Sequence, residues 1–332
     1  MWDFSIGRTF GLMIKTMPFI VFRILVYAGI AIAYVLATGI GAGVGWGIGA
    51  FGDDDFRAGS IFWGGAIGFG LTAGVLYFLR EYILYIVKAG HIAVLVKLID
   101  GEQVPDGQNQ IGYATDIVRA RFVEASVLFG VDQLIKGVLN AIIGIVQGVA
   151  SLLPIPGLSN IVGIIRAFLR IAVGLVDEVI LAYAIRTNST NPWASAQTAL
   201  VLYAQNYPTM LRNAAWLTVI TYGLAFLVFL VMLAPAALIV YLIPGGWSAG
   251  GFLFALIFAC AVKAALIDPF AIAALMEVYF KTTAGQSPDP EWDGRIGSVS
   301  RKFNELKEKA AQWTGGRGSA GGTVPQRTWS IP

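Results

Sequence analysis

The stretch that decides the fold is ILVYAGIAIAYVLATGIGAGVGWGIGAFG, residues 24–52, which contains no charged side chain. Crossing the hydrocarbon core of a bilayer takes about 20 apolar residues in a helix. Uncharged segments follow at 58–79 and at 213–262, and the second of these is long enough for two crossings. The mean hydropathy is +0.71 and only 13% of the residues are charged, against about a quarter in soluble domains. The sequence therefore predicts an all-α polytopic membrane protein.

Glycine occupies every second position between Gly39 and Gly49. This alternation is the period of a strand, but a strand or an open loop in lipid would leave backbone groups unpaired. On a helix the same glycines form two GxxxG ridges on opposite sides. The ridges, both in the first predicted span, are Gly39, Gly43, Gly47 and Gly41, Gly45, Gly49. The second predicted span, span 2 at roughly 60–79, contains Gly64, Gly68, Gly70 and Gly74. We expect one ridge to pack closely on span 2 and the other to contact a further span or a second subunit.

The apolar runs predict six membrane spans in three tandem helical hairpins, at about 24–97, 123–186 and 213–281. The hairpin tips read GDDDFR at 52–57, LLPIPGLSN at 152–160 and IPGGWSAGG at 243–251. The helix of span 2 is expected to continue past the membrane as an amphipathic extension to Lys97.

A weak internal repeat supports the three hairpins. An apolar stretch, a basic residue and a proline-bearing loop recur in the segments 91–105, 176–192 and 267–288. A chance resemblance between apolar segments is the alternative explanation.

Both ends of the chain are predicted to lie outside the transmembrane domain, which takes residues 19–283. Residues 1–18 are interpreted as an interfacial helix, or alternatively as an extension of span 1. A second interfacial helix is expected from Pro192, with Asn191 as its N-cap. Residues 284–332 form a cytoplasmic tail, and the polar composition of its last part predicts disorder.

The tail contains an amphipathic segment at 296–313, in which apolar residues recur with heptad spacing. These residues are Ile296, Val299, Phe303, Leu306, Ala310 and Trp313. So few heptads do not make a stable coiled coil by themselves. We expect this helix to dock on the membrane surface, with partner binding or self-association as the alternative.

The basic residues predict the orientation. The hairpin tips contain Arg57 beside three aspartates, whereas the other ends of the spans carry most of the Lys and Arg. Because positively charged loops stay in the cytoplasm, both termini are expected there and the tips outside. A bacterial inner membrane is the expected location.

Polar side chains in the second hairpin are the first functional candidates, because charges inside a membrane are costly. At about 100° per residue, each of its two spans gathers such side chains on one face. They are Asp132, Lys136, Asn140 and Gln147 on span 3, and Arg166, Arg170 and Asp177 on span 4. Folding the hairpin at its prolines brings Lys136 level with Asp177. The sequence thus predicts a buried polar seam, which is either a solute path or a structural lock, in a hairpin that is either spanning or re-entrant.

Span 6 contains a second candidate, KAALIDPF at 263–270. Pro269 lacks a backbone donor and frees a carbonyl group one turn earlier. With Lys263 and Asp268 beside it, such a break is similar to the interrupted helices that bind ions in transporters. Alternatively, Asp268 caps a helix that restarts at Pro269.

Several functions find no support in the sequence. Cys260 is the sole cysteine and His91 the sole histidine, so a disulfide or a typical zinc or haem site is not expected. The HExxH and P-loop patterns are absent, and the glycines at 39–49 match GxGxxG only outside a nucleotide-binding context. We expect no enzymatic activity, no cofactor, no metal and no nucleic-acid partner.

Two functional hypotheses remain. The first is a channel or transporter for a small solute or ion, anionic if the two arginines line the seam. The second is a membrane scaffold or accessory subunit that binds partners, or copies of itself, through its glycine faces and the helix at 296–313.

Overall fold

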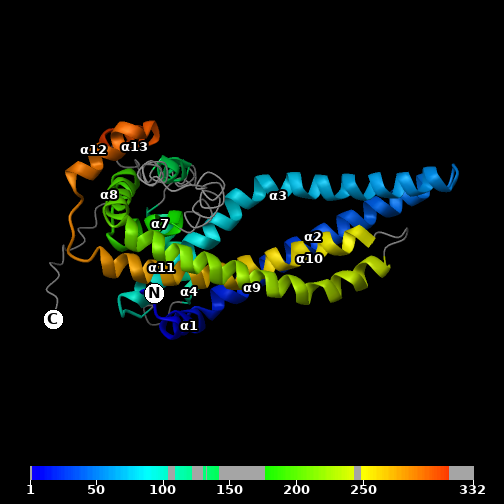
Figure 1. The fold of residues 1–332 in the computed structure, drawn as a ribbon, viewed down its shortest axis with the longest axis horizontal. Coiled ribbons are helices and arrows are strands. Elements are labelled where there is room, and N and C mark those ends of the chain that lie inside the picture. Colours follow the sequence, from blue (N-terminus) through cyan, green and yellow to red (C-terminus); the bar gives the residue numbers. More distant parts are fainter. Residues whose placement is uncertain are drawn as a thin grey trace, which may run out of the picture.

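The computed structural model describes residues 2–103, 109–121, 130–131, 133–141, 176–242 and 248–313. In this part of the chain the regular elements are helices, without strands (Figure 1). They are α1 (Ile6–Lys15), α2 (Met17–Gly49), α3 (Asp54–Ile99), α4 (Gln110–Arg121), α7 (Val176–Arg186), α8 (Pro192–Gln205), α9 (Tyr207–Leu242), α10 (Ser248–Val262), the π-helical segment η1 (Lys263–Ile267), α11 (Asp268–Thr282), α12 (Pro290–Val299) and α13 (Arg301–Gln312).

Two long helical hairpins project from a compact end (Figure 1). One hairpin is α2 with α3, the other is α9 with α10, and α10 packs against α2. The described residues provide four helices that are long and apolar enough to cross a bilayer: Met17–Gly49, Asp54–Leu76, Tyr207–Tyr241 and Gly250–Thr282. The chain is thus an all-helical integral membrane protein, as the composition predicts.

The six spans and three hairpins are not confirmed. Most of the hairpin predicted at 123–186 lies outside the described residues. Its described parts belong to the compact end, where Gly130 faces the ring of Trp193 and Gly137 faces the side chain of Lys302.

The ridge of Gly41, Gly45 and Gly49 forms the contact between α2 and α3. A Cβ atom on Gly41 would overlap the backbone of Gly64, and one on Gly45 would overlap the backbone of Ser60. Gly49 and Gly68 are equally close to the opposite helix, whereas Gly39, Gly43, Gly47, Gly70 and Gly74 have open space around them. The prediction of a close contact on one ridge is therefore confirmed for Gly64 and Gly68, and wrong for Gly70 and Gly74.

The central helix of the compact end is the last part of α3. It does continue past the membrane, but the expected amphipathic pattern is wrong, because residues 89–96 are buried on every side. Helices α2, α4 and α7 surround it. A helix that is apolar all round belongs in a core rather than on a surface.

The three repeated segments correspond to three neighbouring core helices, the end of α3, α7 and α11. Helix α7 contacts both others, with the Tyr183 ring against Tyr279 at 6.1 Å. Arg186 lies over the ring of Phe280 and binds Asp100 at 2.6 Å, so its side chain joins all three helices.

Helix α8 and the tail differ from the sequence-based expectation. Asn191 caps α8 as predicted, but this helix is a core element rather than an interfacial one, because α12 and α13 cover it. The expected helix at 296–313 is interrupted at Ser300, which caps α13 through the backbone N–H of Phe303. Ile296, Phe303 and Leu306 are buried in the protein's own core, so these side chains cannot contact a membrane.

Candidate functional site

Aromatic side chains mark the two ends of the membrane-spanning region. The rings of Trp2 and Trp216 lie 5.5 Å apart in a T-shaped contact beside the compact end, while Trp46, Trp63 and Tyr241 are exposed near the hairpin tips. From Trp216 to Tyr241 there are 25 residue steps (241 − 216), or about 38 Å of helix. This length matches a hydrocarbon core of about 30 Å flanked by interfacial aromatic residues.

A group of buried charged side chains lies where the spans enter the compact end. Arg23, near the start of α2, is only 2% exposed. Its Nε and Nη2 atoms both donate to the carbonyl oxygen of Ala264, at 3.2 and 2.6 Å. A guanidinium group keeps its charge, and the carboxylates of Asp268 and Glu178 lie near enough to act on it electrostatically.

The π-helical turn explains why Ala264 can accept these bonds. In this turn the N–H of Asp268 donates to the carbonyl oxygen of Lys263, five residues earlier. By the same pattern the next N–H, at position 269, would reach Ala264, but Pro269 has none. The predicted free carbonyl group thus exists, and Arg23, from another span, donates to it.

The helix is not broken at this point, and Asp268 does not cap it. Asp268 has helical backbone angles and makes no side-chain capping bond. Its carboxylate instead accepts from the Lys263 ammonium at 2.6 Å, and this ammonium lies 4.8 Å from the centre of the Tyr222 ring. The capping interpretation is therefore wrong, while a π-helical turn inside a helix is frequent at functional sites.

A second ion pair joins α3 to α7. The Lys88 ammonium lies 2.8 Å from Oε1 of Glu178, and Oε2 of Glu178 is buried and has no hydrogen-bond partner in the part of the chain that the structure describes. Burial is the largest single influence and would raise the pKa of the Glu178 carboxyl group, but the charge of Lys88 and hydrogen bonds to the carboxyl group together outweigh burial and hold the pKa below its ordinary range. Glu178 in turn raises the pKa of Lys88. Both groups are therefore charged at neutral pH.

His91 completes the group from α3. Its ring stacks on Phe19 with the centroids 5.3 Å apart, and its Nε2 lies 3.0 Å from the hydroxyl oxygen of Thr16. That hydroxyl group donates to the carbonyl oxygen of Leu12, so His91 is the donor toward it. Burial, and secondly the charge of Arg23, lower the pKa of His91 to about 3. The imidazole is therefore neutral.

The predicted polar seam is described only in part. Lys136 does lie at the level of Asp177, with the ion pair at 3.8 Å. However, Lys136 and Asn140 are exposed, which contradicts the expectation that these two are buried. Asp132, Gln147, Arg166 and Arg170 lie outside the described residues, so their part in a solute path stays a prediction.

Sequence reasoning missed the main members of this group. The sequence patterns single out neither Arg23, which directly precedes the uncharged run 24–52, nor Glu178, which follows Asp177. Lys88 and Glu178 do stand in otherwise apolar stretches, a signal that points to buried partners. Among the described residues, no cluster of three or more His, Cys, Asp or Glu could hold a metal ion.

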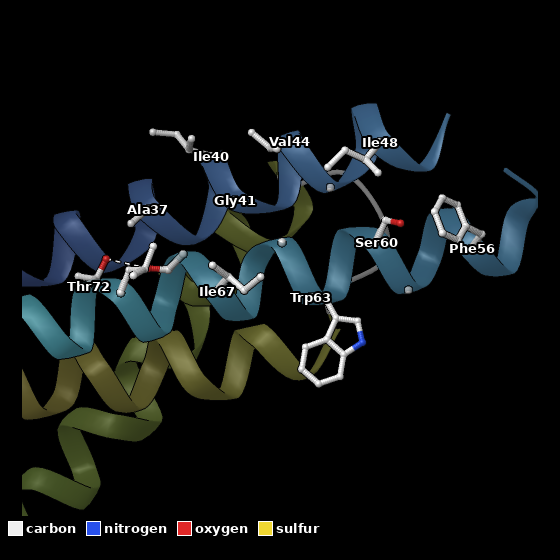
Figure 2. A pocket seen from close by; sticks show the side chains of 15 residues that line it. Ala37, Ile40, Gly41, Val44, Ile48, Phe56, Ser60, Trp63, Ile67 and Thr72 are labelled. Atoms are coloured by element: carbon white, nitrogen blue, oxygen red, sulfur yellow. Dashed lines mark hydrogen bonds between the residues drawn. The ribbon is translucent and has the colours of Figure 1, made fainter. Parts of the chain in front are cut away.

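A separate apolar groove of about 770 Å³ lies on the hairpin of α2 and α3 (Figure 2). Ile40, Val44 and Ile48 border it on α2, and Trp63 and Ile67 border it on α3. It lies within the predicted spans, far along the hairpin from Arg23 and Lys88.

Comparison with protein-family models, with curated proteins and with solved structures finds no match for this chain. Two features of the geometry therefore bear on function. The membrane spans have faces with little internal packing, and a charged group fastens the spans to a compact end.

Proposed function

We propose that the protein is a membrane scaffold or assembly subunit, whose spans pack against other membrane helices, a second copy of the chain included. The observation that carries this proposal is the low internal burial of the spans. Only 22%, 11%, 6% and 33% of the most apolar windows of the four candidate spans are buried within the chain. Residues 89–96 of α3 and the helices α7, α8 and α11 of the compact end, by contrast, are mostly buried.

The open glycine ridge supports the same function. Among the described residues, no atom lies within 4 Å of the position that a Cβ would take on Gly39, Gly43 or Gly47. Small residues at this spacing let two membrane helices approach closely, which is the main source of attraction between helices in lipid. The ridge on the other side of α2 shows such a contact with α3, made by the same residue type at the same spacing.

The charged group suits a scaffold because it holds the parts together. Arg23 links α2 to η1, and Lys88 links α3 to α7, so both hairpins are fastened to one compact end. By the distribution of basic residues, this end and both termini lie in the cytoplasm of a bacterial cell, with the acidic tip of α2 and α3 outside.

Matched glycine variants test the scaffold function. Chemical cross-linking in intact membranes, followed by mass determination in mild detergent, is expected to give an assembly larger than the 35.5 kDa chain. Gly43→Ile on the open ridge should abolish the assembly and leave the helical circular dichroism unchanged. Gly45→Ile should instead destabilise the fold, because its side chain would overlap α3. A wild-type protein that stays monomeric and without partners, or a Gly43→Ile assembly of unchanged size, would overturn the proposal.

A solute or ion path is the second candidate, favoured by Oε2 of Glu178, which is buried and has no hydrogen-bond partner among the described residues. A buried charged oxygen is costly when it is not hydrogen-bonded, so a passing proton or hydrogen-bond donor would be stabilised there. The test is flux into liposomes that contain the full chain, compared with Glu178→Gln and with Arg57→Gln at the tip as control. Loss of flux in Glu178→Gln alone supports a path; absence of flux in the wild type excludes it.

A further inference from the structure

Helix α1 has three distinct faces, and two of them make contacts within the protein. Thr9, Leu12 and Met13 are buried where α1 lies against α11 and the ends of α2 and α3. Thr16, which separates α1 from α2, is also buried and bonds His91. These contacts fix the rotation of α1 about its own axis.

A second face of α1 is apolar and exposed. Ile6, Phe10 and Ile14 recur every four residues along it, and the ring of Phe10 is 60% exposed. Met17, Val21 and Leu25 of α2 are exposed as well and continue the same apolar surface into a membrane span. The surface is therefore continuous with one that lipid covers.

The charged residues of α1 lie on the third face. At about 100° per residue, Lys15 is about 140° and Arg8 about 160° away from Phe10 around the helix. Arg8 bonds Glu277 and the carbonyl oxygen of Ile99, and so faces the compact end. The division into an apolar and a basic side is typical of helices that lie in a membrane surface.

We propose that α1 lies in the plane of the membrane surface, with Ile6, Phe10 and Ile14 among the lipid acyl chains. The continuity with the exposed face of α2 identifies lipid as the occupant. The contacts of Thr9, Leu12 and Arg8 hold α1 against the compact end, which therefore lies at the same membrane surface. Phe4 and Met13, which are also apolar, do not belong to this surface, because both are buried in the protein. The proposal is independent of the scaffold function, since a monomeric protein would hold α1 in the same way.

Site-directed spin labelling of the full chain tests this placement. In a Cys260→Ser background, Phe10→Cys and Ile14→Cys carry the label on the apolar face and Lys15→Cys carries it on the charged face. In vesicles of phosphatidylcholine and phosphatidylglycerol, labels at positions 10 and 14 should collide more often with oxygen, which concentrates in lipid, than with a water-soluble nickel chelate. The label at position 15 should show the opposite order, with at least a severalfold difference in the ratio of the two accessibilities.

Two results would overturn the proposal. Nickel accessibility at position 10 equal to that at position 15 would place the face in water. Low accessibility of positions 10 and 14 to both reagents would mean that protein covers the face instead of lipid.

Discussion

The contact between Arg23 and Ala264 depends on a single proline. Pro269 removes the one backbone N–H that the π-helical turn would direct at the Ala264 carbonyl oxygen, and Arg23 replaces it from another helix. A buried carbonyl group without any donor costs about 1–3 kcal/mol. The arginine is therefore required because of the proline.

This dependence predicts a rescue. Arg23→Ala should lower the free energy of unfolding by about 2 kcal/mol, and Arg23→Ala combined with Pro269→Ala should recover part of that loss, because residue 269 then supplies the N–H. Unfolding of the purified protein in mixed micelles by increasing SDS measures the difference. Arg295→Ala, at an exposed ion pair with Glu291, serves as the control and should cost less than about 1 kcal/mol. Equal losses with and without the proline would refute this account.

His91 predicts a loss of stability in mild acid. Its pKa is about 3 in the folded protein and 6.5 in a solvated reference, so the unfolded chain binds the proton first as the pH falls. The stabilisation is complete above pH 6.5 and decreases by about 2 kcal/mol between pH 6.5 and 5. Below about pH 4.5, the lowered pKa of Glu178 adds a further decrease of the same sign.

The measurement is the free energy of unfolding as a function of pH. His91→Gln retains a donor for Thr16 but cannot be protonated, and should remove the pH dependence between 6.5 and 5. An unchanged slope in that variant would mean that other groups take up the proton.

At the scale of elements, α12 and α13 show how a periodic pattern can be assigned to the wrong surface. The heptad spacing predicts one helix with one apolar face, but Ser300 divides it. Phe303 becomes fully buried while Val299 is 54% exposed. Two short helices can fold back onto α8, which one straight helix cannot.

This difference predicts unequal effects of truncation. Phe303→Ala should lower the free energy of unfolding by about 3–5 kcal/mol, and Val299→Ala should change it by less than about 0.5 kcal/mol. Thermal unfolding followed by circular dichroism distinguishes the two. Similar small effects of both would instead place this apolar face on a membrane or a partner, as the spacing alone suggests.

At the scale of the whole molecule, membrane and compact parts are ordered by different forces. The two helices α2 and α3 meet through glycine backbones, since apolar side chains gain nothing by leaving lipid for one another. The compact end instead buries a large apolar core, together with paired charges that would be costly alone. Arg23, Lys88 and His91 lie at the junction because it is close to both environments.

The amino-acid sequence by itself determined the solvent of this protein and the existence of its long helices. In lipid, the backbone groups of uncharged runs such as 24–52 can only be hydrogen-bonded if the runs are helices. The alternating glycines could be assigned to two ridges because helical geometry is local. The free carbonyl group near Pro269 follows from the same local chemistry.

Only the tertiary structure decided which ridge is occupied, which apolar faces are internal and which charges meet. Arg23 and Ala264 are 241 residues apart, and Lys88 and Glu178 are 90 apart, so no local period can pair them. The faces of α8 and α13 have the composition of membrane-surface helices, yet they cover each other. Period and composition fix how apolar a face is, whereas its neighbour depends on the packing of the whole chain.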